Sequence, residues 1–191
     1  MARPKSDDKR NAILAAATAV FAERGLGAPT SAVSRAAGIA EGTLFTYFTT
    51  KDELINALYR EIKLELADAM MSGFPRKKSI RSRMQHIWDN YINWGVSNPE
   101  PLKVLTQLMV SDIVTAESRQ AGMVPFAEIQ VMYDAAIEGL VFKESVLVEF
   151  VSKALGALAE AVMELMVLNP QSADTYRKAG FEMFWAGIAR K

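Results

Sequence analysis

The segment that most constrains the fold of this chain is a series of three short helix-forming stretches between residues 11 and 54. The first has apolar residues at helical spacing on one face and ends at Gly25. The second and third, at residues 30–37 and 41–47, are much shorter and are separated by a turn at Gly38. Small side chains dominate the second stretch, which lets two helices cross closely. This layout predicts a helix-turn-helix motif.

The third helix of this motif has two different faces. Leu44 and Phe48 are spaced i, i+4 and are predicted to point inward. Thr43, Thr46 and Tyr47 then point outward. Threonine and tyrosine hydroxyls can reach phosphates or base edges, and threonine methyls can touch thymine, so this face suits a DNA groove. From these residues alone, a polar helix face that is merely solvated remains the alternative.

Two more signals mark helix starts. Thr30 is predicted to be the N-cap of the second helix. Thr50 and Glu53 have the spacing of a capping box for a fourth helix, which continues as an apolar stripe and connects the motif to the rest of the chain over about residues 51–73. Lys51 has the wrong sign for the start of a helix dipole, and a nearby phosphate would account for it.

The remainder of the chain also has helical periodicity. Gly122 and Pro125 interrupt or kink one of its helices. The sequence therefore predicts an all-α fold of about nine helices, with a larger helical body after the motif. The predicted helices of this body are at residues 79–97, 102–109, 115–139, 145–168 and 173–189.

Composition and residue spacing argue against catalysis and metal binding, and composition alone leaves only an oxygen-ligand metal site open. The 191 residues include no cysteine and one histidine, His86, so neither a thiolate nor a multi-histidine site is available within one chain. Carboxylates do not cluster at metal-ligand spacing. We therefore expect no enzyme activity, no catalytic residue, no cofactor and no metal. The polar start lacks the apolar core of a signal peptide, and no apolar run could span a membrane, so a cytoplasmic location is expected.

Net charge is zero, but the charge is unevenly distributed. Residues 1–51 carry seven lysines and arginines against four acidic residues, a balance of +3, and the remainder has a balance of −3. The excess is small, and its sign agrees with nucleic-acid binding by the N-terminal segment.

The N-terminal segment closely resembles the DNA-binding domain of the TetR family of transcriptional regulators. The match covers nearly all of residues 10–55 without a gap inside the motif. The matching residues are Ala17, Phe21, Glu23, Gly25, Thr30, Val33, Ala37, Gly38, Ile39, Gly42, Thr43, Leu44, Phe45, Tyr47, Phe48, Lys51 and Leu54. The body resembles the family only in the number and length of its helices.

Three positions depart from the family pattern. Phe45 stands where a tyrosine is usual, so a hydroxyl directed at phosphate is missing. Ala40 replaces a capping serine, which leaves the recognition helix without a side-chain acceptor, and Glu41 supplies only support to the helix dipole. Ser34 replaces alanine and is tolerable if its hydroxyl finds a backbone carbonyl.

The resemblance implies a DNA-binding domain at residues 1–52 and a ligand-binding and dimerisation domain at residues 53–191. It implies a homodimer that binds double-stranded operator DNA of pseudopalindromic sequence through two recognition helices. A small ligand in the body would lower operator affinity, which makes the chain a repressor. An activator of the same family and a helical interaction module without an inducer are the alternatives.

The resemblance also implies the roles of individual residues. Thr43 and Thr46 would meet base edges or the adjoining backbone, with Ser31 contributing from the second helix. The residues expected to hold phosphates are Thr30, Tyr47 and Lys51. The whole set predicted at the DNA is Thr30, Ser31, Glu41, Gly42, Thr43, Phe45, Thr46, Tyr47 and Lys51.

Two further sets of residues are predicted in the body. Aromatic and methionine residues suggest a pocket for an apolar or amphipathic effector, with a plain core role as the alternative: Trp88, Tyr91, Met109, Phe126, Met132 and Tyr133. The last two helices have more apolar surface than one small domain needs, which suggests a partner surface or, alternatively, a buried core. The residues predicted at a dimer interface are Leu155, Ala157, Leu158, Val162, Phe181, Phe184 and Trp185.

Overall fold

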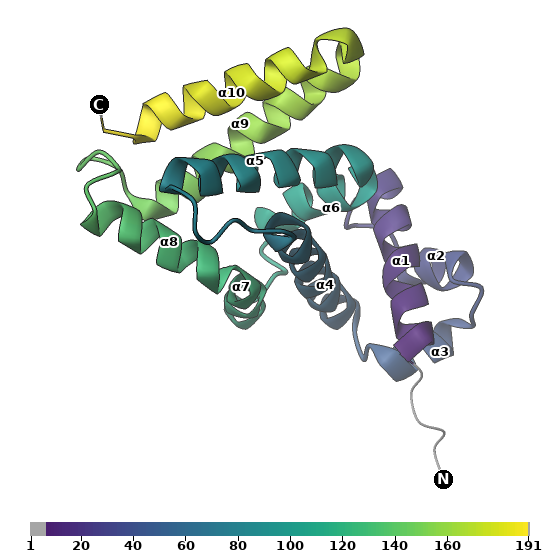
Figure 1. Ribbon diagram of the computed structural model, residues 1–191. Coiled ribbons are helices and arrows are strands. Elements are labelled where there is room, and N and C mark those ends of the chain that lie inside the picture. The colour runs from purple at the N-terminus through teal and green to yellow at the C-terminus, as the bar shows by residue number, and fades with distance from the viewer. Residues whose placement is uncertain (1–6, 191) are drawn as a thin grey trace. The chain divides into compact units, whose positions relative to one another are not determined.

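The computed structural model describes residues 7–190, which form ten α-helices and two short 3-10 helices and contain no β-strand. The predicted all-α fold is confirmed. By packing, the described residues fall into two units. The first holds the residues up to Glu65 together with Asn98–Val124, and the second holds Leu66–Ser97 and the residues from Pro125 onwards. Figure 1 follows the chain through both.

The helices divide between the units as follows. The first unit contains α1 (Asp7–Arg24), α2 (Thr30–Ala36), α3 (Glu41–Tyr47), most of α4 (Lys51–Met71), α6 (Pro99–Met109) and α7 (Ala116–Met123). The second contains the end of α4, α5 (Ile80–Ser97), α8 (Ala127–Glu138), α9 (Val148–Leu168), the 3-10 helix η2 (Pro170–Ser172) and α10 (Ala173–Ile188). The 3-10 helix η1 (Val124–Phe126) joins α7 to α8.

The expected helix at residues 115–139 is interrupted rather than kinked. It is divided into α7 and α8 by η1, which contains Pro125. Proline has no amide hydrogen to donate to the preceding turn, so an α-helix cannot pass through it unbroken. This break raises the expected number of about nine helices to ten in the described residues.

The division by packing differs from the division at residues 52/53 taken from the sequence. Helix α6 packs on α1, and α4 contributes residues to both units. The sequence-based boundary separates the segment that resembles a DNA-binding domain from the rest of the chain, whereas the packing boundary lies within α4 and again after α7.

Helix α1 forms as its sequence predicts. Its apolar stripe is buried, with Ile13 and Phe21 fully so. The helix ends where Gly25 adopts a φ of +76°, and the Gly25 amide donates to the Phe21 carbonyl at 2.9 Å. Glycine takes this left-handed conformation without steric cost, which ends the helix.

A buried amide holds α4 to the segment between α6 and α7. Asn56 on α4 is 7% exposed. Its Nδ2 donates to the carbonyls of Ile113 at 2.9 Å and Asp52 at 2.8 Å, and its Oδ1 accepts from the Thr115 amide at 2.9 Å. Thr115 in turn caps α7, since its hydroxyl accepts from the Ser118 amide. The start of α4 and the start of α7 are therefore positioned together.

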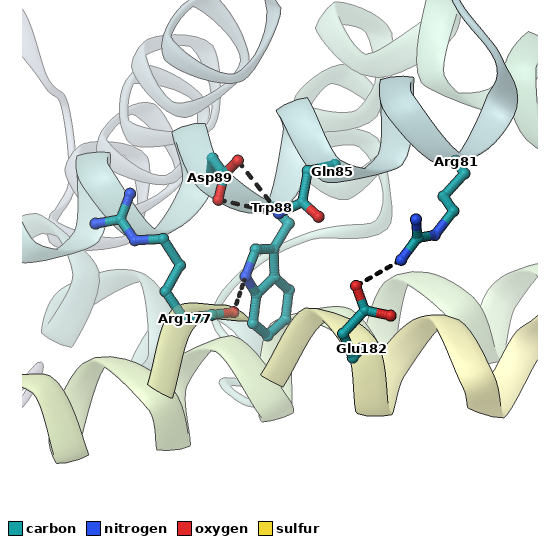
Figure 2. Close-up of polar contacts among 6 residues, drawn as sticks. All are labelled: Arg81, Gln85, Trp88, Asp89, Arg177 and Glu182. Carbon is teal, nitrogen blue, oxygen red and sulfur yellow. Dashed lines mark hydrogen bonds and ion pairs between the residues drawn. The ribbon is translucent and has the colours of Figure 1, made fainter. Parts of the chain in front are cut away.

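The second unit is built on the packing of α5, α9 and α10. Trp88 of α5 is fully buried, and its ring stacks on Phe184 with the centroids 6.2 Å apart. Its Nε1 donates to the Arg177 carbonyl of α10 at 3.0 Å, and Arg81 pairs with Glu182 further along the same two helices (Figure 2). An indole N–H needs a partner when buried, and α10 supplies it.

The end of α10 is fixed by the segment before α9. The Lys143 amide donates to the Ile188 carbonyl at 2.8 Å, and Lys143 Nζ donates to the carbonyls of Ala186 and Gly187. An isolated bridge pairs Phe142 with Ala189. Among residues 7–190, no helix is both long and apolar enough to cross a membrane.

Candidate nucleic-acid interface

The turn between α2 and α3 has a fixed geometry. Gly38 has a φ of +66°, and its amide donates to the Arg35 carbonyl at 3.1 Å. The Ile39 amide donates to the Ser34 carbonyl at 3.0 Å, which turns the chain sharply into α3. The Ser34 hydroxyl donates to the Ser31 carbonyl at 3.2 Å, so the serine that departs from the family pattern satisfies its hydrogen-bonding group.

Helix α3 is anchored through one face. Leu44 and Phe48 are buried, 0% and 2% exposed, which confirms that they point inward. The opposite face is open, and Phe45 on it is 40% exposed. None of the nine residues predicted at the DNA is buried, and all belong to the first unit: Thr30, Ser31, Glu41, Gly42, Thr43, Phe45, Thr46, Tyr47 and Lys51.

The prediction that Thr30 caps α2 is wrong. The N-cap position belongs to Pro29, and no side chain bonds to the helix start there. The Thr30 hydroxyl instead donates to Glu41 Oε1 at 2.7 Å, which joins the first residue of α2 to the first residue of α3. A partner eleven positions away is beyond what local sequence signals can indicate. The N-cap of α3 is Ala40, also without a side-chain bond, as expected from its missing hydroxyl.

Two features of α3 concern Gly42, on its outer surface. The Thr46 hydroxyl donates to the Gly42 carbonyl at 3.1 Å within the same helix. A Cβ atom at Gly42 would have no heavy atom within 4 Å. Glycine inside a helix lowers stability relative to alanine, and the packing of this chain does not require it at Gly42.

The start of α4 borders the same surface. The Glu53 amide donates to Thr50 Oγ1 at 3.0 Å, which confirms the first half of the capping box. The Glu53 carboxylate accepts from both the amide and the hydroxyl of Thr49 at 2.6 Å. Lys51 Nζ lies 6.0 Å from the centroid of the Phe21 ring, a cation–π distance, so α1 helps to hold this cation in place.

The six residues predicted for an effector pocket do not belong to one unit. Met109 lies in the first unit and is half-buried, while the other five lie in the second and are buried. Burial raises the pKa of Tyr91, with a further rise from the Glu160 charge. Burial also raises the pKa of Tyr133, which is hydrogen-bonded to Ser152. Both phenols are therefore neutral at physiological pH.

Two hollows stand out in the described residues, and the six pocket candidates line neither. One, of about 430 Å³, lies in the first unit between α1, α4 and α6. Glu61 and Glu65 line it, and burial together with the Glu61 charge raises the pKa of Glu65. Within residues 7–190, no group of three or more histidine or carboxylate side chains could hold a metal ion.

The other hollow is an apolar groove of about 460 Å³ on the surface of α9 and α10. Of the predicted interface residues, Leu155, Val162 and Phe181 are buried in the core of their own unit. Phe184 is buried as well but also borders the groove. Ala157 and Leu158 lie in the groove, whereas Trp185 is half-buried beside Phe181.

The prediction did not include several groove residues with exposed apolar surface. Phe150 is 64% exposed and Met183 67% exposed, and Ala154 and Ala161 line the same groove. The spacing of Phe150, Ala154 and Ala161 with Ala157 follows a single helix face, which periodicity could have indicated.

Comparison with known proteins agrees with the fold and the motif. A sequence model of the bacterial regulatory proteins of the tetR family matches residues 13–58, which include α2, α3 and the start of α4. A solved structure of a tetR family transcription regulator from Marinobacter aquaeolei VT8 matches with a TM-score of 0.86 and 20% identity, covering 97% of each chain.

Two further solved structures match over nearly the full chain. A protein from Shewanella sp. PV-4, assigned to the same family, is 25% identical with a TM-score of 0.86, covering 96% of this chain and 99% of that one. Another from Vibrio parahaemolyticus is 24% identical with a TM-score of 0.80, covering 96% of this chain and 100% of that one. The family match at residues 13–58 and the structural matches along the whole chain show that this chain is similar throughout to TetR-family transcription regulators.

Proposed function

We propose that the protein is a homodimeric, ligand-responsive repressor that binds a pseudopalindromic operator. The observation that carries the proposal is the surface of the first unit, where the polar face of α3 is open while Leu44 and Phe48 anchor the opposite face. A short helix held in this way can enter a major groove without losing its own packing.

On this surface, Thr43 and Thr46 face base edges or the adjoining backbone, and Ser31 reaches the DNA from α2. Tyr47 and Lys51 hold phosphates and fix the register, as does Thr30 once its hydroxyl is released from Glu41. Gly42 also supports the proposed contact between α3 and DNA. The open space at this glycine allows the DNA to approach the backbone of α3 closely.

The groove on α9 and α10 is proposed as the dimer interface, with a second copy of the chain as its occupant. It is lined almost wholly by apolar side chains, and Phe150 and Met183 beside it are mostly exposed in the single chain. Gly187 lines the groove, and a Cβ there would meet nothing within 4 Å, so a partner helix can approach closely. Two such faces would form a four-helix interface, as the family resemblance implies.

The effector is proposed to act through α4. This helix begins at Lys51, directly beside the recognition helix, and its last residues belong to the second unit. A small apolar or amphipathic molecule lowers operator affinity only if it binds the DNA-incompetent arrangement more tightly. A coupling of about 1–3 kcal/mol would weaken operator binding about 5- to 150-fold.

The test is an electrophoretic mobility shift with DNA that flanks the protein's own gene, measured across a salt series. A specific shift that weakens steeply with salt supports the proposed function, because phosphate contacts release counterions. Native mass spectrometry of the same preparation shows whether the protein already carries a bound molecule. Failure of ligand-free protein to shift any flanking fragment or any sequence selected from a random pool would contradict the proposal.

A further inference from the structure

The hydrogen bond between Thr30 and Glu41 has consequences for DNA recognition. Thr30 Oγ1 donates to Glu41 Oε1 at 2.7 Å, and on the surface proposed to contact DNA Glu41 is exposed while Thr30 is half-buried. No described lysine or arginine lies within ion-pair distance of the Glu41 carboxylate. The carboxylate at the first residue of the recognition helix therefore has no ion-pair partner among residues 7–190.

This arrangement opposes non-specific DNA binding in two ways. Phosphate oxygens are acceptors only, and the single hydroxyl proton of Thr30 is already given to Glu41, so Thr30 cannot donate to a phosphate while the pair is intact. The Glu41 carboxylate also repels the phosphates of any sequence. A donor on the DNA that takes the place of Thr30 at Glu41 Oε1 offsets the repulsion with a hydrogen bond and frees the Thr30 hydroxyl.

In the major groove, cytosine N4 and adenine N6 are both donors, but adenine also presents the acceptor N7 beside N6, so cytosine suits a carboxylate better. We propose that Glu41 is a specificity-determining residue that accepts from a cytosine amino group in each half-site and thereby releases the Thr30 hydroxyl to donate to a neighbouring phosphate. This inference rests on the proposed DNA-binding surface.

The exchange makes two contacts depend on one base. At a cytosine, the amino group replaces the Thr30 hydroxyl as the donor to Glu41, and Thr30 gains a phosphate. Where guanine or thymine stands at that place, its polar major-groove atoms are acceptors, so Glu41 gains no partner from the base and Thr30 keeps its internal partner. The penalty for a wrong base is then larger than that of one lost hydrogen bond, because the phosphate contact is lost with it.

The experiment is selection of binding sites from random-sequence duplexes with the full chain and its Glu41→Ala, Glu41→Gln and Thr30→Val variants, followed by affinity measurement on the selected and on random DNA. The wild type is expected to select a cytosine at one position of each half-site. Glu41→Ala should accept any base there, with discrimination reduced about tenfold. Its affinity for random DNA should rise about three- to tenfold, because one repulsive charge is removed and Thr30 is freed.

The glutamine variant sharpens the test. A glutamine side chain pairs with adenine in the major groove, so Glu41→Gln should change the selected base from cytosine to adenine. Thr30→Val should keep the cytosine preference but bind the selected site more weakly. In the Thr30→Val background, the gain in random-DNA affinity from Glu41→Ala should be smaller, because there is no hydroxyl to release.

The outcomes separate this inference from the proposed function. If the wild type selects a defined site and Glu41→Ala selects the same site with unchanged or lower affinity for random DNA, the role of Glu41 is refuted while the DNA-binding function stands. If the wild type selects no site, the proposed function itself fails. Circular dichroism and the thermal midpoint of each variant check that the fold is retained, and a folded Glu41→Gln that still selects cytosine also refutes the exchange.

Discussion

Gly180 of α10 and Trp88 of α5 fit so closely that a Cβ atom at Gly180 would lie 2.8 Å from Trp88 Cζ2 and 2.6 Å from Val162 Cγ2. The indole is fully buried and is bonded to the Arg177 carbonyl, so it cannot move aside (Figure 2). Close packing in the second unit therefore requires a glycine at position 180 of the chain.

We predict that Gly180→Ala lowers the free energy of unfolding. Alanine gains about 0.8–1 kcal/mol of helix propensity over glycine, but overpacking a core costs about 1–3 kcal/mol, and the contacts below 3 Å place this site at the upper end. Chemical denaturation measures the difference. Gly156→Ala on α9 is the matched control, since a Cβ there has open space and the variant should be slightly more stable. If Gly180→Ala and Gly156→Ala stabilise the protein equally, the Trp88 side chain shifts to make room for the added methyl group.

Asn56→Leu should also destabilise the protein. The leucine would leave the Thr115 amide and the Ile113 carbonyl without the partners that Asn56 now provides. A buried polar group without a partner costs about 1–3 kcal/mol. Urea unfolding tests this, with the exposed Asn11→Ala on α1 as a control that should change the free energy of unfolding little. An unchanged midpoint for Asn56→Leu would mean that water replaces the lost bonds.

Gly42→Ala should separate stability from DNA binding. The added methyl meets nothing in the chain, so the free energy of unfolding should rise by about 0.5–1 kcal/mol. The same methyl projects from the surface proposed to approach the DNA, and affinity for the selected site should fall. Thermal unfolding and mobility shift on one preparation measure both effects. If Gly42→Ala is more stable and binds DNA as tightly as the wild type, the DNA does not approach Gly42 closely.

Lys51→Ala should weaken binding to all sequences alike. Lys51 lies over the Phe21 ring at the edge of the proposed DNA surface, and it is assigned to a phosphate. Its loss should reduce the slope of log affinity against log salt by about one. Thr43→Ala, in contrast, should alter sequence preference. The control is Lys77→Ala, an exposed lysine of the second unit that should leave the slope unchanged. If the slope is unchanged in Lys51→Ala, Lys51 does not contact a phosphate.

Ala157→Glu should convert the proposed dimer into a folded monomer. Ala157 is exposed and lines the apolar groove of α9 and α10, and a charge buried there without a partner is costly. Sedimentation velocity reports the mass, and circular dichroism reports the helix content. Val131→Glu, on an exposed position of α8 outside the groove, should leave the mass unchanged. If Ala157→Glu is still a dimer, the dimer interface does not lie at this groove.

The local sequence determined most of the first unit. The apolar stripe of α1, the end of that helix at Gly25, and the inward position of Leu44 and Phe48 all follow from periodicity and glycine placement, and each is confirmed. These features depend on residues within a few positions of one another, where helix geometry alone fixes which side chains share a face.

Tertiary contacts decided the partner of Thr30 and which face of α9 is buried. Thr30 is the first residue of α2 rather than its N-cap, and its hydroxyl donates to Glu41 of another helix. Helix α9 is apolar on more than one side, so its periodicity could not show that Val151, Leu155 and Val162 face the core while Ala157 and Phe150 lie outside. A helical pattern gives the faces of a helix, but which face is buried depends on the neighbours that the folded chain brings to it.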